Sequence, residues 1–449
     1  MRKKMMQLCV VALLLLGCGG PAETSGALPQ TKAQDVAFVN VNVVPMDSER
    51  VLTGQTVLVR GEEIVQIGPA GKVKVPAGAL RVDGRGKYLM PGLAEMHGHI
   101  PPPQAPKEFT EAVLFMYVAN GVTTVRGMLG APGQLELRER ANRGELLSPT
   151  LYLAGPSFNG NSVNSPGQAA EMVRQQKREG WDLLKVHPGL TREEYDAMAR
   201  TAREEGIRFA GHVPADVGLA HALAMGQETI DHVDGYVEHL GAEGAPLDET
   251  KLAEVVRLTK KSGAWIVPTM ALWETLLGIT SIEKLLSYPE LKYMPAQQVQ
   301  AWEKAHRARQ SAPQFDRKKA EQTAANRKRI LKALYDGGVP VIFGTDAPQQ
   351  FSVPGFSVRH EMASMLEAGM TPYQIILTAT KNAGEYHKNK ARFGTVTAGS
   401  RADLILVGGD PLKDLSNVGR RAGVMVRGRW LTEDEIQKRL ASIAANGKL

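Results

Sequence analysis

Short apolar runs alternate with longer amphipathic stretches through the middle of the chain, which predicts strands that alternate with helices. Eight runs are predicted strands, and they end near Glu95-Met96, Thr124-Val125, Leu151–Leu153, Leu183–Val186, Phe209-Ala210, Thr229–Asp231, Trp265–Val267 and Val341–Phe343. Helical patterns separate them, for example over Pro166–Glu179, Arg192–Glu205 and Asp248–Lys261. The pattern predicts an α/β fold, a (β/α)8 TIM barrel. A doubly wound sheet is disfavoured because no glycine-rich dinucleotide fingerprint follows the first strand.

The two ends of the chain show a different pattern of short strands with turn residues between them. The predicted strands are Ala37–Val44, Thr56–Val59, Ile64–Ile67 and Leu80–Val82 near the start, and Ala402–Val407, Gly423–Val426 and Trp430-Leu431 near the end. Neither end shows a long helix in this reading. We therefore expect both ends to meet in one small β-sandwich domain beside the barrel.

These patterns divide the chain into five parts. They are a signal peptide (1–18), a flexible tether (19–35), a β-sandwich (36–89 plus 391–435), the barrel (90–390), and an insertion between strands seven and eight (270–338). The insertion contains a basic, glutamine-rich stretch, Ala296–Lys332, that is predicted to form two helices. An excursion of this size at a barrel rim is either a lid or a plain structural addition, and the sequence leaves both open.

The first residues resemble a bacterial lipoprotein signal. Arg2, Lys3 and Lys4 precede a short apolar stretch, Leu8–Leu16, which is followed by Gly17 and Cys18. This resemblance implies cleavage before Cys18, a lipid on that cysteine, and a place in the bacterial cell envelope, periplasmic or at the outer membrane. An ordinary secretory signal cut elsewhere is the alternative. The expected membrane contact is through the N-terminal lipid only.

Composition narrows the choice of partners and ligands. The 449 residues are 43% hydrophobic and 22% charged, which is ordinary for a globular protein with a large core. The net charge of +7 is spread out, and we interpret its densest run, Arg317–Lys319 and Arg327–Arg329, as a solvated helix face rather than a nucleic-acid surface. The only cysteines are Cys9 and Cys18. A metal in the folded part would therefore need His, Asp, Glu or a modified Lys as ligands.

Residues that can bind metal lie at the ends of the predicted strands. They are His97 and His99 after strand one, Lys185 on strand four, His212 after strand five, His232 after strand six and Asp346 after strand eight. His97 and His99 are two residues apart, so their side chains point to the same face of a strand and can bind one ion together. Because barrel enzymes gather catalytic groups at the carboxyl ends of their strands, we expect these side chains to meet.

The chain resembles the amidohydrolase superfamily over about residues 36–431. The matching motifs are Pro91-Gly92-Leu93, Glu95–His99, Gly121–Arg126, Lys185, Gly211-His212, Asp231-His232, Gly344–Asp346, Gly394–Val396, Gly399 and Ala402–Leu404. The resemblance implies two divalent ions, with zinc expected and manganese, cobalt or iron left open. His97, His99 and Asp346 would bind the first ion, and His212 and His232 the second.

The resemblance also implies that Lys185 bridges both ions as an N6-carboxylated side chain. Its alternatives are a Schiff-base lysine, which leaves four histidines unexplained, and a simple ion pair. A hydroxide held between the ions would attack a carbonyl, with Asp346 as general acid and base.

Within the superfamily, the pattern looks closest to the prolidase-like, binuclear dipeptidase branch. Its members cleave Xaa-Pro and related dipeptides or N-acyl amino acids, so the expected partner is a small-molecule or dipeptide substrate. Deaminases of the superfamily typically carry a Glu where this chain has Ala215. The loop Gly155–Asn161 lacks a histidine that many prolidase-like relatives have. A cyclic-amide or imidazolone-type hydrolase, a deaminase and a non-catalytic binding scaffold are the remaining alternatives.

Substrate contacts are open at this stage. Tyr236 is a candidate to donate a hydrogen bond to the oxyanion, or else a solvated rim tyrosine. Arg126 either holds a substrate carboxylate or forms a structural ion pair, and the second role is favoured. His360 and Glu361 are expected to pack or cap, and His187 is given no role.

Overall fold

The structure of the protein is a computed structural model, which describes residues 34–446. The described elements all belong to one unit, Lys32–Leu449. The predicted signal peptide, Cys18 and all but the last two residues of the tether lie outside the described residues. Within residues 34–446, no helix combines the length and the apolar character needed to cross a membrane.

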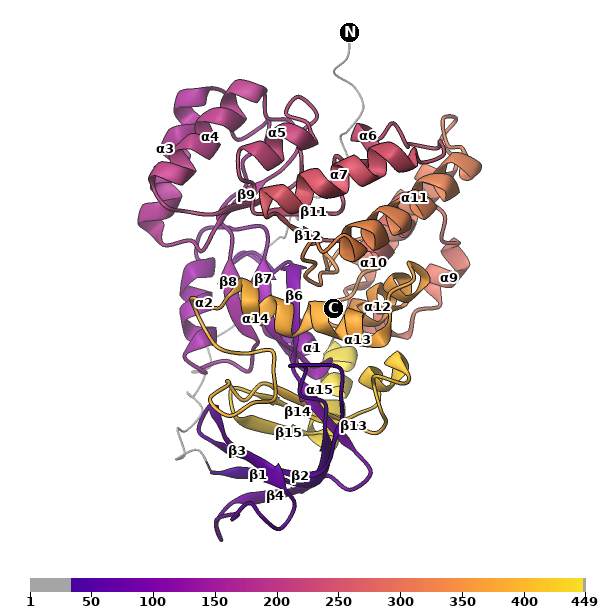
Figure 1. The fold of residues 1–449 in the computed structure, drawn as a ribbon. Coiled ribbons are helices and arrows are strands. Elements are labelled where there is room, and N and C mark those ends of the chain that lie inside the picture. The colour runs from indigo at the N-terminus through magenta and orange to yellow at the C-terminus, as the bar shows by residue number, and fades with distance from the viewer. Residues whose placement is uncertain (1–33, 447–449) are drawn as a thin grey trace. The chain divides into compact units, whose positions relative to one another are not determined.

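Strands from the two ends of the chain share one sheet. They are β1 (Val36–Val43), β2 (Leu52–Arg60), β3 (Glu63–Pro69), β4 (Leu80–Asp83), β5 (Tyr88–Pro91), β13 (Leu404–Val407), β14 (Arg421–Val426) and β15 (Arg429–Thr432). The order is β15-β14-β13-β5-β1-β2-β3, with β4 beside β1, and the antiparallel β5–β13 pair joins the two ends. The indigo and yellow strands lie side by side in Figure 1.

This sheet folds back on itself. Phe38 in β1 and Trp430 in β15 are far apart in the strand order, yet their ring centroids are 5.1 Å apart with the rings edge to face. Phe38 belongs to a cluster of buried side chains, and the partly buried Trp430 packs against that cluster. The buried apolar side chains of strands from the two chain ends therefore pack together in one cluster.

The expectation that both ends lack long helices is wrong for the C-terminal end. Helix α15 (Glu433–Asn446) follows β15 directly. Its apolar residues Ile436 and Leu440 are four apart and are both buried, which is the spacing of one helix face.

Two parallel sheets form the middle of the chain. One contains β6 (Leu93–Gly98), β7 (Val122–Gly127) and β8 (Thr150–Leu153); the other contains β9 (Leu184–Val186), β10 (Phe209–Gly211), β11 (Thr229–Asp231) and β12 (Trp265–Val267). Parallel bridges Ala154–Leu183 and Phe158–Val186 connect the first sheet to the second. The predicted eighth strand makes one bridge, Val341 to Ile266, instead of a regular strand. The Phe343 carbonyl then accepts a hydrogen bond from the Met96 N–H at 2.8 Å, so the segment after Val341 is hydrogen-bonded to β6.

The helices between these strands are α1 (Lys107–Ala119), α2 (Gln134–Asn142), α3 (Pro166–Glu179), α4 (Arg192–Glu204), α5 (Leu219–Ala224), α6 (Tyr236–His239), α7 (Glu249–Ser262), α12 (Ser357–Glu367), α13 (Pro372–Ala379) and α14 (Lys381–Tyr386). The start and stop signals of α3 are local. Ser165 caps its N-terminus, Pro166 follows at the first position, and Gly180 ends it in the left-handed conformation. Helices α3, α4 and α7 confirm the helical patterns read from the sequence.

The insertion is a set of helices: α8 (Met270–Leu276), α9 (Ile282–Leu286), the 3-10 helix η1 (Pro289–Tyr293), α10 (Ala296–Gln310) and α11 (Arg317–Asp336). Helices α10 and α11 confirm the two predicted helices. The interpretation of the basic run as a solvated face is wrong for Arg327, which is only 3% exposed. Its position on α11 is one turn from Thr323 and one from Ile330, both also buried.

Candidate metal centre

His97, His99 and Asp346 converge at one end of the parallel strands. One ligand atom from each lies within 4.8 Å of the others. His99 Nε2 is 2.6 Å from Asp346 Oδ1, and His97 Nε2 is 3.5 Å from the same oxygen. Sequence analysis placed these three residues together as one set of ligands, and the structure brings them together.

Gly98 allows the two histidines to sit on one short segment. A Cβ at this position would lie 2.8 Å from the Tyr117 hydroxyl oxygen and 2.9 Å from Glu95 Cγ. Only glycine fits there without a shift of those groups. Close packing around Gly98 therefore explains why a glycine stands between the two histidines.

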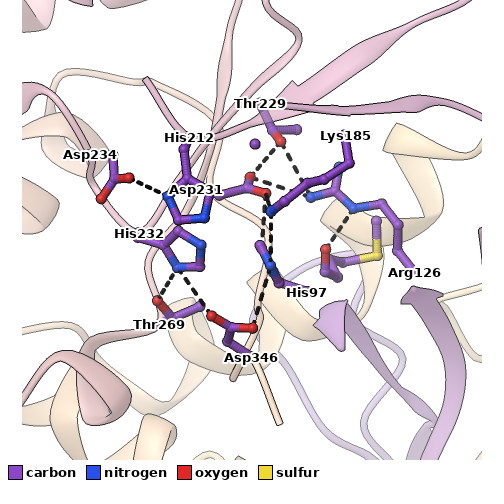
Figure 2. Close-up of polar contacts among 12 residues, drawn as sticks. His97, Arg126, Lys185, His212, Thr229, Asp231, His232, Asp234, Thr269 and Asp346 are labelled. Atoms are coloured by element: carbon purple, nitrogen blue, oxygen red, sulfur yellow. Dashed lines mark hydrogen bonds and ion pairs between the residues drawn. The ribbon is translucent and has the colours of Figure 1, made fainter. Parts of the chain in front are cut away.

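His212 and His232 complete a group of imidazoles on neighbouring strand ends. The His232 ring centroid is 4.5 Å from that of His97 and 4.5 Å from that of His212. Figure 2 shows these three rings and Asp346 facing a common space. Burial, and then the charge of neighbours, lowers the pKa of His97 and of His232 well below the usual value. Both rings are thus neutral, which is the form that binds metal.

Two polar neighbours orient the second pair of histidines. Asp234 Oδ2 is 2.5 Å from His212 Nδ1, and Thr269 Oγ1 is 2.8 Å from His232 Nδ1. Partners of this kind fix the ring orientation of metal-binding histidines. Sequence analysis missed both residues. The one available signal was that Asp234 follows His232 by two positions.

Lys185 lies in the same cluster of candidate ligands, which comprises His97, His99, His212, His232 and Asp346. Its side chain is fully buried, with Nζ 3.2 Å from His97 Nε2 and 3.8 Å from Asp231 Oδ2. Burial lowers the pKa of Lys185, although the nearby carboxylates of Asp231 and Asp346 raise it. The lysine thus has a stronger tendency than usual to be a neutral amine.

Asp231 is the central carboxylate that sequence analysis quoted in a motif without giving it a role. It is fully buried, with Oδ2 2.8 Å from His97 Nδ1 and Oδ1 3.4 Å from Arg126 Nη2. Thr229 donates a hydrogen bond to it at 2.5 Å. The favoured structural role of Arg126 is confirmed, because its guanidinium is fully buried in these contacts and in one to the Met96 carbonyl.

Glu95 connects the two segments that bear the first three ligands. Its Oε1 accepts hydrogen bonds from the N–H groups of His97 and Thr345, and its Oε2 accepts one from the Thr345 hydroxyl. Burial raises the pKa of Glu95 to about 8, although these hydrogen bonds lower it. Asp346 follows Thr345 in a left-handed conformation, with φ at +62°. The site therefore holds an uncommon backbone geometry through buried hydrogen bonds.

Tyr236 does not reach the cluster, in contrast to both sequence-based alternatives. It is fully buried, and its hydroxyl lies 2.8 Å from Thr259 Oγ1 on α7. The reason is local: Tyr236 opens helix α6, which turns the ring toward α7. Its burial excludes a solvated rim position, and its hydroxyl is engaged by Thr259.

The structure also shows the contacts of Glu361 and His187. Glu361 caps helix α8, as the capping hypothesis predicted, by accepting hydrogen bonds from the N–H groups of Met270 and Ala271. His187 was given no role, yet its ring stacks on His212 with centroids 5.0 Å apart. It lies two residues after Lys185, and this spacing was the available signal.

The cluster fits divalent metal ions. His232 Nε2 is buried and makes no hydrogen bond within the described residues, whereas the buried His97 Nδ1 and Asp231 Oδ2 lie 2.8 Å from each other. Buried polar atoms are nearly always paired, so the unpaired His232 Nε2, beside two other imidazoles and Asp346, indicates a missing cationic partner. Imidazole and carboxylate ligands suit zinc and similar ions.

The chain is similar to known proteins over most of its length. A curated relative, adenine deaminase 3 of Rhizobium meliloti (strain 1021), is 25% identical over 90% of this chain, and the chain spans 58% of that protein's length. Among solved structures, an Xaa-Pro dipeptidase with bound methionine in its active site matches with a TM-score of 0.68 at 22% identity. That match covers 89% of this chain and 100% of the dipeptidase.

A bottromycin amidohydrolase structure matches with a TM-score of 0.73 at 21% identity, covering 92% of this chain and 91% of the other. At these identities the structural matches show the fold alone. The profile described as "Amidohydrolase family" matches residues 88–431, which include every residue of the cluster. The chain belongs to the amidohydrolase family.

Proposed function

We propose that this protein is a two-metal hydrolase that cleaves the amide bond of an Xaa-Pro-type dipeptide or an N-acyl amino acid. One observation carries the proposal: His97, Lys185, His212, His232 and Asp346 face one space, with His99 beside Asp346, and the buried His232 Nε2 there makes no hydrogen bond within the described residues. Membership of the amidohydrolase family supports action on a carbon–nitrogen bond. The dipeptidase-like fold supports the substrate class.

His97, His99 and Asp346 would hold one ion, and His212 and His232 the other. When bound, such ions lower the pKa of water and polarise a carbonyl oxygen. The protein contributes neutral imidazoles, whose pKa values burial lowers, and fixed ring orientations from Asp234 and Thr269. It thereby fixes the ligand geometry before metal arrives.

Asp346 would carry the proton from the attacking water to the leaving nitrogen. Its Oδ1 lies beside both His97 and His99, while its Oδ2 is 3.8 Å from His232 Nδ1. A carboxylate at this position can accept a proton from the attacking water and return it to the leaving nitrogen.

Lys185 would bridge the two ions as a carbamate. In this step the neutral amine forms an N–C bond to carbon dioxide and releases one proton to solvent. The lowered pKa of the buried Lys185 amine supports the step, because only the neutral amine reacts.

The parallel strands would form a closed barrel of eight, with the sheet of both chain ends as a small sandwich. The bridges from β8 to β9 and from β12 to Val341, and the hydrogen bond from Met96 to Phe343, support closure. The contact of Phe38 with Trp430 supports the sandwich. The proposed boundaries are 90–390 for the barrel and 36–89 plus 391–435 for the sandwich.

The test combines metal analysis with a substrate panel. We expect about two equivalents of divalent metal per chain and release of free amino acid from Xaa-Pro dipeptides or N-acyl amino acids. An H97N variant should lose turnover and bind less metal than the wild type, while an R329M variant on the exposed face of α11 should keep wild-type metal content and turnover. A metal-free wild-type protein that turns over no member of the panel would contradict the proposal.

A second candidate is deamination of a purine such as adenine, which the names of the curated relatives favour. Ala215 stands where deaminases of the superfamily typically carry a glutamate, which disfavours it. Ammonia release from adenine by the metal-loaded protein, with no cleavage of the dipeptide panel, would establish this alternative.

A further inference from the structure

Arg327 is a buried cation that the insertion places next to the metal centre. It lies on α11, and its side chain is 4% exposed. Its guanidinium carbon is 3.8 Å from the centroid of the Trp273 ring on α8, in a stacked cation–π contact. A buried arginine is costly unless it is paired, so its partners indicate its role.

Its two polar partners both belong to the half of the site formed by His212 and His232. Arg327 Nη2 donates a hydrogen bond to the His232 carbonyl oxygen, and lies 3.7 Å from Asp234 Oδ1. The other oxygen of Asp234 is 2.5 Å from His212 Nδ1. One guanidinium thus contacts the main chain of one histidine and the carboxylate that orients the other.

The main chain that Arg327 contacts is in an unfavourable conformation. His232 and Val233 have φ values of +64° and +56°, in the left-handed region that non-glycine residues rarely adopt. Such a residue is strained and persists only where its surroundings hold it. The hydrogen bond from Arg327 to the His232 carbonyl is one of the contacts that hold it.

The helices that carry Arg327 and Trp273 are fastened to each other and to α12. Lys328 Nζ is 2.7 Å from Glu274 Oε1 and also contacts Glu367, so it joins α11 to α8 and α12. Glu361 of α12 binds the first two N–H groups of α8. Thr269, just before α8, contacts His232 Nδ1. The insertion therefore contacts the metal centre through Arg327, and the residue directly before it, Thr269, contacts the same histidine.

We infer that Arg327 is a positioning residue that links the insertion to the second metal site and sets the affinity of that site. The inference rests on the proposed two-metal function. It assigns to the insertion a structural task at the His212–His232 pair, distinct from a lid over the substrate. Among the described residues, Arg327 makes no hydrogen bond or ion pair with His97, His99 or Asp346, the ligands of the first site.

The test measures the binding of two successive equivalents of Co²⁺, added to metal-free full-length protein and followed by its visible absorption. In R327M, which keeps an unbranched apolar side chain over Trp273, the second equivalent should bind about 10- to 100-fold more weakly. The first equivalent should bind as in the wild type. R329M is the matched control on the same helix: Arg329 is exposed and pairs with the exposed Glu249, so both equivalents should bind normally.

Two further variants keep the inference open to refutation. If R327M does not fold, R327K retains the charge but not the planar donor group, and it should weaken the second equivalent in the same direction. D234N should weaken it too, and adding R327M to D234N should cost less than the sum of the two effects. Unchanged second-site affinity in R327M or R327K overturns the inference alone. A wild-type protein that binds fewer than two equivalents overturns the proposed function and the inference together.

Discussion

At the scale of single residues, the site is organised by buried charges that compensate one another. Asp231 and Arg126 are both fully buried, and each has the other as a charged neighbour. Lys185 is also within 3.8 Å of Asp231. A buried ion pair adds little net stability, but removal of one partner leaves the other charge unpaired in the interior.

D231N should therefore destabilise the metal-free protein by about 3–5 kcal/mol, because Arg126 loses its carboxylate. Denaturant unfolding of chelator-treated protein measures this change without any contribution from metal binding. D83N is the control: it breaks an exposed pair with Arg85 and should leave the unfolding midpoint unchanged. A midpoint for D231N equal to that of the wild type would show that Arg126 is compensated by other groups.

Glu361 predicts a pH dependence of stability. Burial raises its pKa to about 8 in the folded protein, against an ordinary value of 4.5, although its hydrogen bonds from α8 lower it. Between these two values the folded state binds a proton that the unfolded state does not, so this group's contribution to stability falls as pH rises.

In E361Q this contribution is absent. The unfolding free energy of the wild type should fall more steeply than that of E361Q between pH 5 and pH 8. Denaturant unfolding at several pH values compares the two slopes, so that a constant offset from the amide does not matter. Parallel slopes would show that Glu361 is ionised throughout this range.

The same scale shows where sequence reasoning succeeded and failed. The ligand candidates were predictable because each lies on or directly after an apolar run that predicts a strand, and strand ends meet. The role of Arg327 could not be predicted from the sequence, because its contacts to His232 and Asp234 depend on how the insertion packs. Tyr236 was assigned wrongly because its proximity to His232 along the chain says nothing about the direction in which α6 turns it.

At the scale of elements, strand ends control where the ligands point. Gly211 ends β10 directly before His212, and its φ is +129°. A Cβ there would lie 2.3 Å from the carbonyl oxygen of Val186 on the neighbouring strand. The strand pattern was predictable, but this close approach of two backbones was not, because it depends on strand register.

G211A should lower both the unfolding free energy and the affinity of the second metal equivalent, because the clash with Val186 displaces His212. G206A is the matched control, since Gly206 also has a positive φ but a Cβ there would meet nothing within 4 Å. It should lose about 1 kcal/mol of stability through backbone strain and bind metal normally. Equal metal affinity in the two variants would contradict a role for the Gly211 contact.

At the scale of the whole molecule, metal binding and folding are expected to be coupled. The candidate ligands come from strand ends that are distant in sequence and meet only in the folded chain. A ligand that binds only the folded state stabilises it by mass action, by about 2.7 kcal/mol at a concentration of 100 times the dissociation constant.

The thermal unfolding midpoint should therefore rise when zinc is added to chelator-treated protein, and should fall again when chelator is restored. A double variant, H97N with H99N, should show a smaller rise because it lacks two ligands of one site. Calorimetry measures both midpoints. An equal rise in the wild type and the double variant would show that zinc binds elsewhere.

The pairing of β5 with β13 has a consequence for synthesis on the ribosome. Strand β5 emerges about 300 residues before its partner, so one edge of the N-terminal sheet stays open through most of translation. An unpaired edge is a template for association with other chains until it is covered. The N-terminal strands therefore cannot form their complete sheet early in synthesis. The sheet is completed only when the C-terminal strands have left the ribosome and β13 pairs with β5.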